Sequence, residues 1–428
     1  MPILPRAQYA KEGEVKMNWT AWGLETTGET EREGHILVRA EAESDGSRTP
    51  VVINLLLDRS GSMKGAPMAA AVEAAQQLVD QAGPEDFLGL VVFDAVAEQR
   101  VPVTAMNERG KRQMGQALGE IMTGRGTALH QAVDLGAKAL SRLLVPGRRP
   151  KLLLLTDGEP SVGPETESAF QELGQRVAQA GVGVHALGLG RHYLPEILAA
   201  LTLPSENSYE HVDGPDGLPV AMGAVFAVLF GEAAQGASVQ VRPDGFLALG
   251  CRHGFPTRVD RDSLVISLGG ISRGLPRRVL LTGTLSADTW GAEITGSCQE
   301  RGDSRRQGVP LRKVPAESRE GRLVRAVGLE LELVGAETVA WLSLAQRDPD
   351  RAGAVLLAAE QTLRELTALG VEEIAIDRHH ERVTDLRAAV ERGEGDIPMM
   401  VRRAKAAKAG THVSQVIPLE PHLAKKGP

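Results

Sequence analysis

The sequence predicts an α/β fold in which a doubly wound, mostly parallel sheet is inserted into a β-sandwich and followed by a C-terminal helical region. Three observations support this prediction. Short, nearly continuous apolar runs alternate with helical stripes over residues 51–189. Strands that alternate apolar and polar residues flank this part on both sides, and helical periodicity dominates from about residue 317. Each pattern is typical of the layer that it predicts.

The central part consists of strands and helices in alternation. Strands are expected at residues 51–57, 87–93, 152–155 and 182–189, and apolar positions with helical spacing fall within residues 68–79, 114–121, 129–144 and 170–177. Strands that are apolar throughout are covered by helices on both faces of their sheet. Because crossover connections between parallel strands are right-handed, the carboxyl ends of these strands are expected along one edge.

The flanking parts predict a sandwich that the central domain interrupts. Residues 36–43 alternate apolar and polar side chains before the first buried strand, and Val239 and Val241 do so after the last one. Further strands are expected at residues 264–268 and 279–285. The expected division is sandwich strands at 1–48, the α/β domain at 49–234, the rest of the sandwich at 235–316 and the helical region at 317–428.

Composition narrows the class of protein. The chain has 428 residues and a net charge of −7, and its first six residues contain no apolar core of the kind found in signal peptides. It lacks an apolar run of about eighteen residues, so we expect no membrane span, and we expect a cytoplasmic location. Such a weakly acidic chain is not expected to bind nucleic acid. Cys251 and Cys298, whose spacing matches no zinc motif, are expected to be reduced and buried.

Polar side chains suited to a metal ion follow the predicted strands. The segment Asp58-Arg59-Ser60-Gly61-Ser62 follows the first buried strand, and Thr156-Asp157-Gly158 follows the strand at residues 152–155. Between them, Gly124-Arg125-Gly126-Thr127 places a hydroxyl in a glycine-rich loop. Ligands of open α/β sheets bind at the carboxyl ends of the strands, where these segments are expected to meet. The alternative to a metal site is that the first segment only caps the N-terminus of the helix that follows it.

These residue types match the preferences of a hard divalent cation. Mg²⁺ takes oxygen ligands in octahedral geometry and retains several waters, so a site with few charged ligands suits it. Ser60, Ser62 and Thr127 would be neutral direct ligands, while Asp58 and Asp157 would act largely through bound water. A dication facing only two carboxylates stays electrophilic toward a third. We expect Mg²⁺, with Ca²⁺ or Mn²⁺ as alternatives.

The order of these segments resembles the von Willebrand factor A domain and its metal-ion-dependent adhesion site, whose pattern is Asp-x-Ser-x-Ser, then Thr, then Asp. The resemblance covers residues 50–232 and implies that the metal residues are Asp58, Ser60, Ser62, Thr127 and Asp157. The layout is similar to bacterial A-domain proteins loosely grouped with calcium-activated chloride channel homologues and inter-alpha-trypsin inhibitor heavy chains. By analogy, residues 217–229 would be the element that moves if the domain switches.

The function expected from this reading is metal-dependent protein binding, in which a partner presents an Asp or Glu to the metal. Arg59, Met63, Lys64 and residues 159–164 are expected to contact that partner and set specificity. The first alternative is a metal-dependent hydrolase, for which His130 is the nearby general-base candidate. The second is an architectural protein whose metal only stabilises the loops. Neither alternative is excluded by the sequence, although no catalytic residue is expected.

Overall fold

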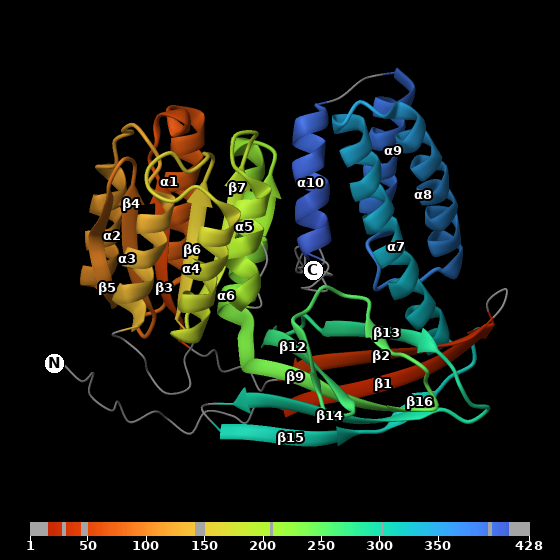
Figure 1. The fold of residues 1–428 in the computed structure, drawn as a ribbon. Coiled ribbons are helices and arrows are strands. Elements are labelled where there is room, and N and C mark those ends of the chain that lie inside the picture. The colour runs from red at the N-terminus through yellow and green to blue at the C-terminus, as the bar shows by residue number, and fades with distance from the viewer. Residues whose placement is uncertain are drawn as a thin grey trace, which may run out of the picture.

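The computed structural model describes residues 16–27, 31–43, 50–141, 150–205, 209–300, 303–392 and 396–410. Within these residues the chain forms an α/β domain, a sandwich of two five-stranded sheets and a group of C-terminal helices (Figure 1). The predicted fold class is therefore confirmed. In Figure 1 the α/β domain and the C-terminal helices stand side by side, and the sandwich lies beneath both.

A six-stranded sheet forms the centre of the α/β domain, in the order β5-β4-β3-β6-β7-β8. Its strands are β3 (Val52–Asp58), β4 (Phe87–Phe93), β5 (Ala97–Ala105), β6 (Lys151–Thr156), β7 (Gly183–Leu189) and β8 (Tyr209–Val212). All neighbours pair in parallel except β4 and β5, which form an antiparallel pair at one edge. The carboxyl ends of the five parallel strands therefore share one edge.

Helices cover both faces of this sheet. They are α1 (Ala66–Gln81), α2 (Glu108–Gly119), α3 (Leu129–Ser141), α4 (Glu167–Gln179), α5 (Pro195–Thr202) and α6 (Leu218–Gly231). Leu55 and Leu57 of β3 belong to the core with α1, α2 and α6, whereas Leu56 belongs to the core with α3, α4 and α5. Because successive strand residues point to opposite faces, a strand that is apolar throughout supplies both cores.

The sandwich is built from segments on both sides of the α/β domain. One sheet has the order β10-β13-β2-β1-β16 and the other the order β11-β12-β9-β14-β15. The strands are β1 (Lys16–Thr27), β2 (Arg32–Glu43), β9 (Glu232–Asp244), β10 (Gly250–Cys251), β11 (Thr257–Asp260), β12 (Ser263–Ser272), β13 (Arg277–Thr284), β14 (Gly291–Glu300), β15 (Asp303–Val309) and β16 (Leu311–Lys313). The insertion lies between β2 and β9, and α6 leads directly into β9.

The C-terminal helices pack on the outer face of the sandwich. They are α7 (Arg319–Ala345), α8 (Pro349–Leu369), α9 (Ile376–Arg392) and α10 (Ile397–Gly410). Leu24, Leu37 and Leu280 of the sandwich share their core. The last helix, α10, lies between the other C-terminal helices and the α/β domain (Figure 1). Among the described helices, none is both long and apolar enough to cross a bilayer.

Candidate metal centre

The predicted metal residues gather where β3 and β6 end. These two strands pair in parallel, with Leu57 opposite Leu155, so Asp58 and Thr156 end side by side. After Asp58 the chain makes a single turn of 3₁₀-helix at Gly61–Met63 and then enters α1. This tight turn brings Ser60 and Ser62 back over the end of the sheet.

Asp58 is held from both sides by hydrogen bonds. Its side chain is fully buried. One carboxylate oxygen accepts the backbone N–H of Ser60 at 2.8 Å, and the other accepts the hydroxyl of Thr156 at 2.5 Å. A carboxylate restrained in this way keeps one orientation, and oriented polar groups are the basis of a preformed site.

The two serines connect Asp58 to Asp157. The hydroxyl oxygens of Ser60 and Ser62 are 3.1 Å apart, and the Ser62 hydroxyl donates to Asp157 Oδ1 at 2.7 Å. Ser60 and Asp157 are buried, whereas Ser62 is exposed. The open side of the site therefore lies next to Ser62.

Backbone hydrogen bonds fix the loop that carries Thr127. The N–H of Thr127 donates to Ser161 Oγ at 3.0 Å, and the N–H of Ser161 donates to the carbonyl of Thr127 at 3.1 Å. The N–H of Gly124 donates to the carbonyl of Arg59 at 2.7 Å. The loops after β3 and β6 thus both hold the Thr127 loop against the end of the sheet.

Gly158 lies where oxygen atoms from two other segments, the one after β3 and the Thr127 loop, converge. A Cβ atom at this position would lie 3.3 Å from Thr127 Oγ, 3.6 Å from Asp58 Oδ2 and 3.7 Å from Ser60 Oγ. Only a glycine leaves this space free of side-chain carbon. We call the group of Asp58, Ser60, Ser62, Thr127 and Asp157 the oxygen cradle.

Burial makes negative charge in the oxygen cradle unfavourable. Burial raises the pKa of Asp58 to about 6, although the hydrogen bonds from Thr156 and Ser60 oppose the rise. Burial also raises the pKa of Asp157, while the Ser62 hydroxyl and the charge of His192 lower it. A cation bound beside these two buried carboxyl groups would offset the cost of ionising them, so their raised pKa values favour cation binding.

The residues present fit a small divalent cation. The oxygen cradle supplies only oxygen atoms, three of them hydroxyl, which suits a hard ion such as Mg²⁺. Within the part of the chain that the structure describes, no group of three or more His, Cys, Asp or Glu side chains is arranged to hold a metal. A metal here would therefore depend on the serine and threonine hydroxyls.

The predicted specificity residues divide into three groups. Met63 is buried in the core of the α/β domain, so its prediction as a partner contact is wrong. The 3₁₀ turn directs its side chain inward. Arg59 forms an ion pair with Asp94 at 3.3 Å, which reduces its freedom to bind a partner. Lys64 is exposed, as are most of residues 159–164.

The hydrolase candidate His130 lies in the first turn of α3 and packs against α4. Its ring meets the ring of Phe170 edge to face, with centroids 5.7 Å apart, and burial lowers the pKa of its imidazole. This contact joins α3 to α4. Sequence reasoning also missed Thr156 and Gly158 as parts of the site, although both belong to the Thr-Asp-Gly segment that it singled out.

Comparison with known proteins identifies the domain. Residues 53–159 match the model of the von Willebrand factor type A domain family. The chain therefore contains a von Willebrand factor type A domain. It is 28% identical over 189 residues to an uncharacterized protein of Synechocystis, covering 44% of this chain and 43% of that protein. It is 30% identical over 167 residues to inter-alpha-trypsin inhibitor heavy chain H4 of Sus scrofa, covering 38% and 18% respectively. The chain thus spans less than half the length of these curated relatives.

Two solved structures share the arrangement well beyond the A domain. A von Willebrand factor type A protein from Catenulispora acidiphila aligns with a TM-score of 0.73 and 15% identity, covering 94% of this chain and 97% of that one. The ArnB paralog VWA2 from Sulfolobus acidocaldarius aligns with a TM-score of 0.58 and 16% identity, covering 93% and 99%. At such low identity the likeness shows the fold alone: an A domain, a sandwich and C-terminal helices occur together.

Proposed function

We propose that this chain is a metal-dependent protein-binding module whose A domain takes up a carboxylate from a partner protein. The oxygen cradle carries this proposal, because oxygens of Asp58, Ser60 and Thr127 meet around the space left by Gly158, and the Ser62 hydroxyl joins the carboxylate of Asp157 to this group. A bound Mg²⁺ would supply an electrophilic centre with a position open to an Asp or Glu side chain.

The residues of the oxygen cradle have distinct parts in this proposal. Ser60, Ser62 and Thr127 would bind the ion directly through neutral oxygens. Asp58 and Asp157 would balance its charge, largely through water. The hydrogen bonds from Thr156 and the Ser60 backbone already hold Asp58 in one orientation, so little rearrangement is needed on binding. Ca²⁺ and Mn²⁺ also accept oxygen ligands and are the alternatives.

Exposed apolar side chains beside the oxygen cradle add a second kind of contact. Val96, Met122 and Val162 are 58%, 78% and 37% exposed and lie on the loops after β4, α2 and β6. A Cβ at Gly126, next to Thr127, would lie 3.2 Å from Val162 and 3.4 Å from Ala95, which places two of these loops together. We call Val96, Met122 and Val162 the apolar rim. Exposed apolar residues around a polar centre are typical of a protein interface.

Two alternatives receive less support. A hydrolase would need a general base within reach of metal-bound water, and the contact that supports a structural role for the candidate base His130 is its edge-to-face packing on Phe170. The proposal therefore assigns no catalytic residue. A purely architectural role would not explain why the apolar side chains of the rim are exposed to solvent. It would also predict that metal raises thermal stability while substitutions in the oxygen cradle leave partner binding unchanged.

Isothermal titration of the full chain with Mg²⁺ tests the metal part of the proposal. The chain should bind one ion, and Thr127→Ala should weaken binding by about tenfold or more because a direct ligand is lost. Thr362→Ala is the matched control, since its exposed hydroxyl only donates to a carbonyl within α8. Absence of Mg²⁺ binding by the unaltered chain, or equal binding by both variants, would contradict the proposal.

A further inference from the structure

Helix α10 belongs to two hydrophobic cores at once. Ala406 is buried in the core that contains α3, α4 and α5 of the A domain, whereas Ala404 is buried in the core of the C-terminal helices. The hydroxyl of Thr338 in α7 donates to the carbonyl of Ala404 at 3.4 Å. α10 therefore fills the space between the A domain and α7, as Figure 1 shows.

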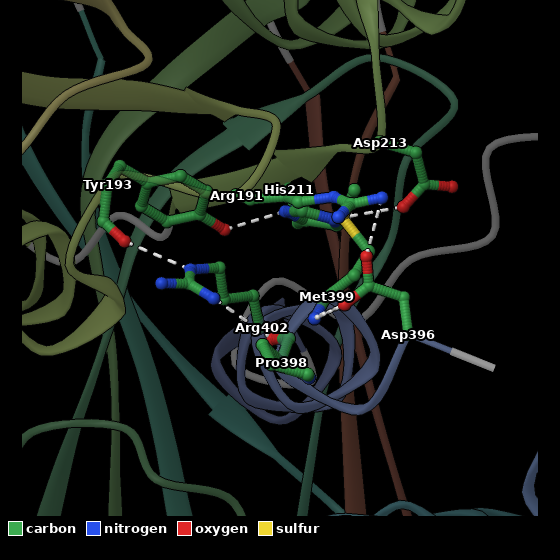
Figure 2. Close-up of polar contacts among 8 residues, drawn as sticks. All are labelled: Arg191, Tyr193, His211, Asp213, Asp396, Pro398, Met399 and Arg402. Atoms are coloured by element: carbon green, nitrogen blue, oxygen red, sulfur yellow. Dashed lines mark hydrogen bonds and ion pairs between the residues drawn. The ribbon is translucent and has the colours of Figure 1, made fainter. Parts of the chain in front are cut away.

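Polar contacts attach α10 to the loop after β7 (Figure 2). Arg191 forms an ion pair with Asp396, just before α10, at 2.7 Å. The guanidinium of Arg402 donates to the backbone carbonyl of Tyr193 at 3.0 Å. The guanidinium carbon of Arg402, Cζ, lies 5.9 Å from the centre of the Tyr193 ring, which adds a cation–π attraction. The loop at residues 190–193 is thus held at two points by α10.

A hydrogen-bonded chain that runs from the interior to the surface extends this contact to β8. The Tyr193 hydroxyl and His211 Nδ1 share a hydrogen bond of 2.8 Å, and His211 Nε2 is hydrogen-bonded to the exposed carboxylate of Asp213 at 2.9 Å. Met399 of α10 places its sulfur 3.1 Å from the same His211 nitrogen (Figure 2). Any displacement of α10 therefore removes neighbours from both Tyr193 and His211.

The same loop lies beside the oxygen cradle. β6 and β7 pair in parallel with Thr156 opposite Gly188, so Leu189, the last residue of β7, lies next to Asp157 and the loop after β7 starts at this end of the sheet. The Tyr193 ring packs on Gly188 so closely that a Cβ there would lie 2.4 Å from it. Tyr193 therefore contacts α10 on one side and the strand beside Thr156 on the other.

We propose that α10 is a detachable clamp whose docking on residues 191–193 and β8 is coupled to occupancy of the oxygen cradle. The docked clamp holds Tyr193 on Gly188 and so keeps the ends of β6 and β7 in the arrangement that binds metal. Undocking loosens this edge and weakens metal binding. This inference rests on the proposed function, since it requires that the oxygen cradle binds a cation.

The size and contacts of α10 suit a clamp. It has 14 residues, and a lone helix of about this length is only marginally stable in water, so α10 depends on its docking contacts. Few polar groups make those contacts. Substitution of Asp396 or Arg402 removes one such contact without changing any residue of the oxygen cradle. Linkage then requires that metal and docking favour each other by the same factor.

Two measurements on the full chain test the coupling. In the first, hydrogen exchange of residues 397–410 is followed with and without saturating Mg²⁺. In the second, Mg²⁺ affinity is measured for the double variant Asp396→Asn with Arg402→Ala. The control is Arg387→Ala, which breaks a similar ion pair with Glu360 between α9 and α8 and does not touch the A domain.

The expected results are reciprocal. Mg²⁺ should slow exchange of the α10 amides by about fivefold or more, and the double variant should lose Mg²⁺ affinity by a similar factor, while Arg387→Ala stays within about twofold. Unchanged exchange, unchanged affinity of the double variant, or an equal loss in the control would each overturn the coupling. A chain that binds no Mg²⁺ at all would instead contradict the proposed function, which separates the two failures.

Discussion

The Thr156 hydroxyl donates to the buried carboxylate of Asp58 across 2.5 Å and so links the ends of β6 and β3. Neither residue is free to turn, because Asp58 also accepts the Ser60 N–H and Thr156 lies in a paired strand. This contact orients one of the two carboxylates of the oxygen cradle. Its removal should therefore affect the candidate metal site without removing any proposed ligand.

Thr156→Val keeps the shape of the side chain and removes the hydroxyl. The buried carboxylate of Asp58 then loses a hydrogen bond, which costs about 1 to 3 kcal/mol in the charged form. We expect Mg²⁺ affinity to fall by about tenfold or more, because Asp58 is less well oriented and holds a proton more tightly. Calorimetric titration measures this. Affinity equal to that of the unaltered chain would show that Asp58 needs no support from Thr156.

Gly158→Ala would place a methyl group among Thr127 Oγ, Asp58 Oδ2 and Ser60 Oγ. Because the methyl occupies the space around which these oxygens converge, we expect Mg²⁺ binding to be lost while the circular dichroism spectrum stays native. Gly335→Ala in α7 is the control, since a Cβ there meets no atom within 4 Å. Normal Mg²⁺ binding by Gly158→Ala would mean that the ion, if bound, sits elsewhere.

Glu210 on β8 should make stability depend on pH. Burial raises the pKa of Glu210 from 4.5 to about 7, although the charge of Arg378 opposes the rise. A raised pKa means that the folded chain holds this proton more tightly than the unfolded chain. The contribution of Glu210 to the free energy of unfolding is therefore fully present below about pH 4.5 and is lost as the pH rises through 7.

The matching experiment compares the chain with Glu210→Gln in EDTA. Between pH 4.5 and 7.5 the unaltered chain should lose on the order of 2 to 3 kcal/mol of unfolding free energy relative to the variant. Urea titrations at several pH values give this difference. Parallel stability curves for the two proteins would show that Glu210 titrates normally in the folded chain.

The apolar rim should affect partner binding but not metal binding. Met122→Ser and Val162→Ser remove exposed apolar surface beside the oxygen cradle, so they should weaken Mg²⁺-dependent partner capture by about tenfold each and leave Mg²⁺ affinity unchanged. Leu357→Ser on α8, which is 68% exposed, is the control. Full partner capture by both rim variants would remove the apolar rim from the interface.

The buried strands could be predicted from sequence because their apolar runs are continuous. β4 and β7 lie within the predicted ranges, whereas β3 extends one residue past its predicted end and β6 extends one residue past its prediction at each end. The edge strands β5 and β8 were not predictable in the same way, since they carry charged and polar residues such as Arg100 and Glu210. In β1 the buried residues Met17, Trp19 and Ala21 alternate with less buried ones, but the large apolar Trp22 falls on the opposite face and hides this period, so the pairing with β2 becomes evident only in three dimensions.

The candidate site was predictable for a different reason. Its residues follow strand ends, and the shared edge of a parallel sheet brings such segments together whatever their separation in sequence. The structure does bring Asp58, Ser60, Ser62, Thr127 and Asp157 together. The inward turn of Met63 depends on local geometry after Ser62, and the docking of α10 joins residues about 200 positions apart, such as Tyr193 and Arg402. Neither leaves a periodic pattern in the sequence.

The central claim is that metal in the oxygen cradle gates protein binding, and comparative capture tests it most directly. The full chain is used to capture proteins from a lysate of its source in Mg²⁺, in EDTA, and as Asp157→Ala in Mg²⁺. The account predicts that a defined set of proteins is retained only with Mg²⁺ and intact Asp157. An identical set in all three conditions would contradict it.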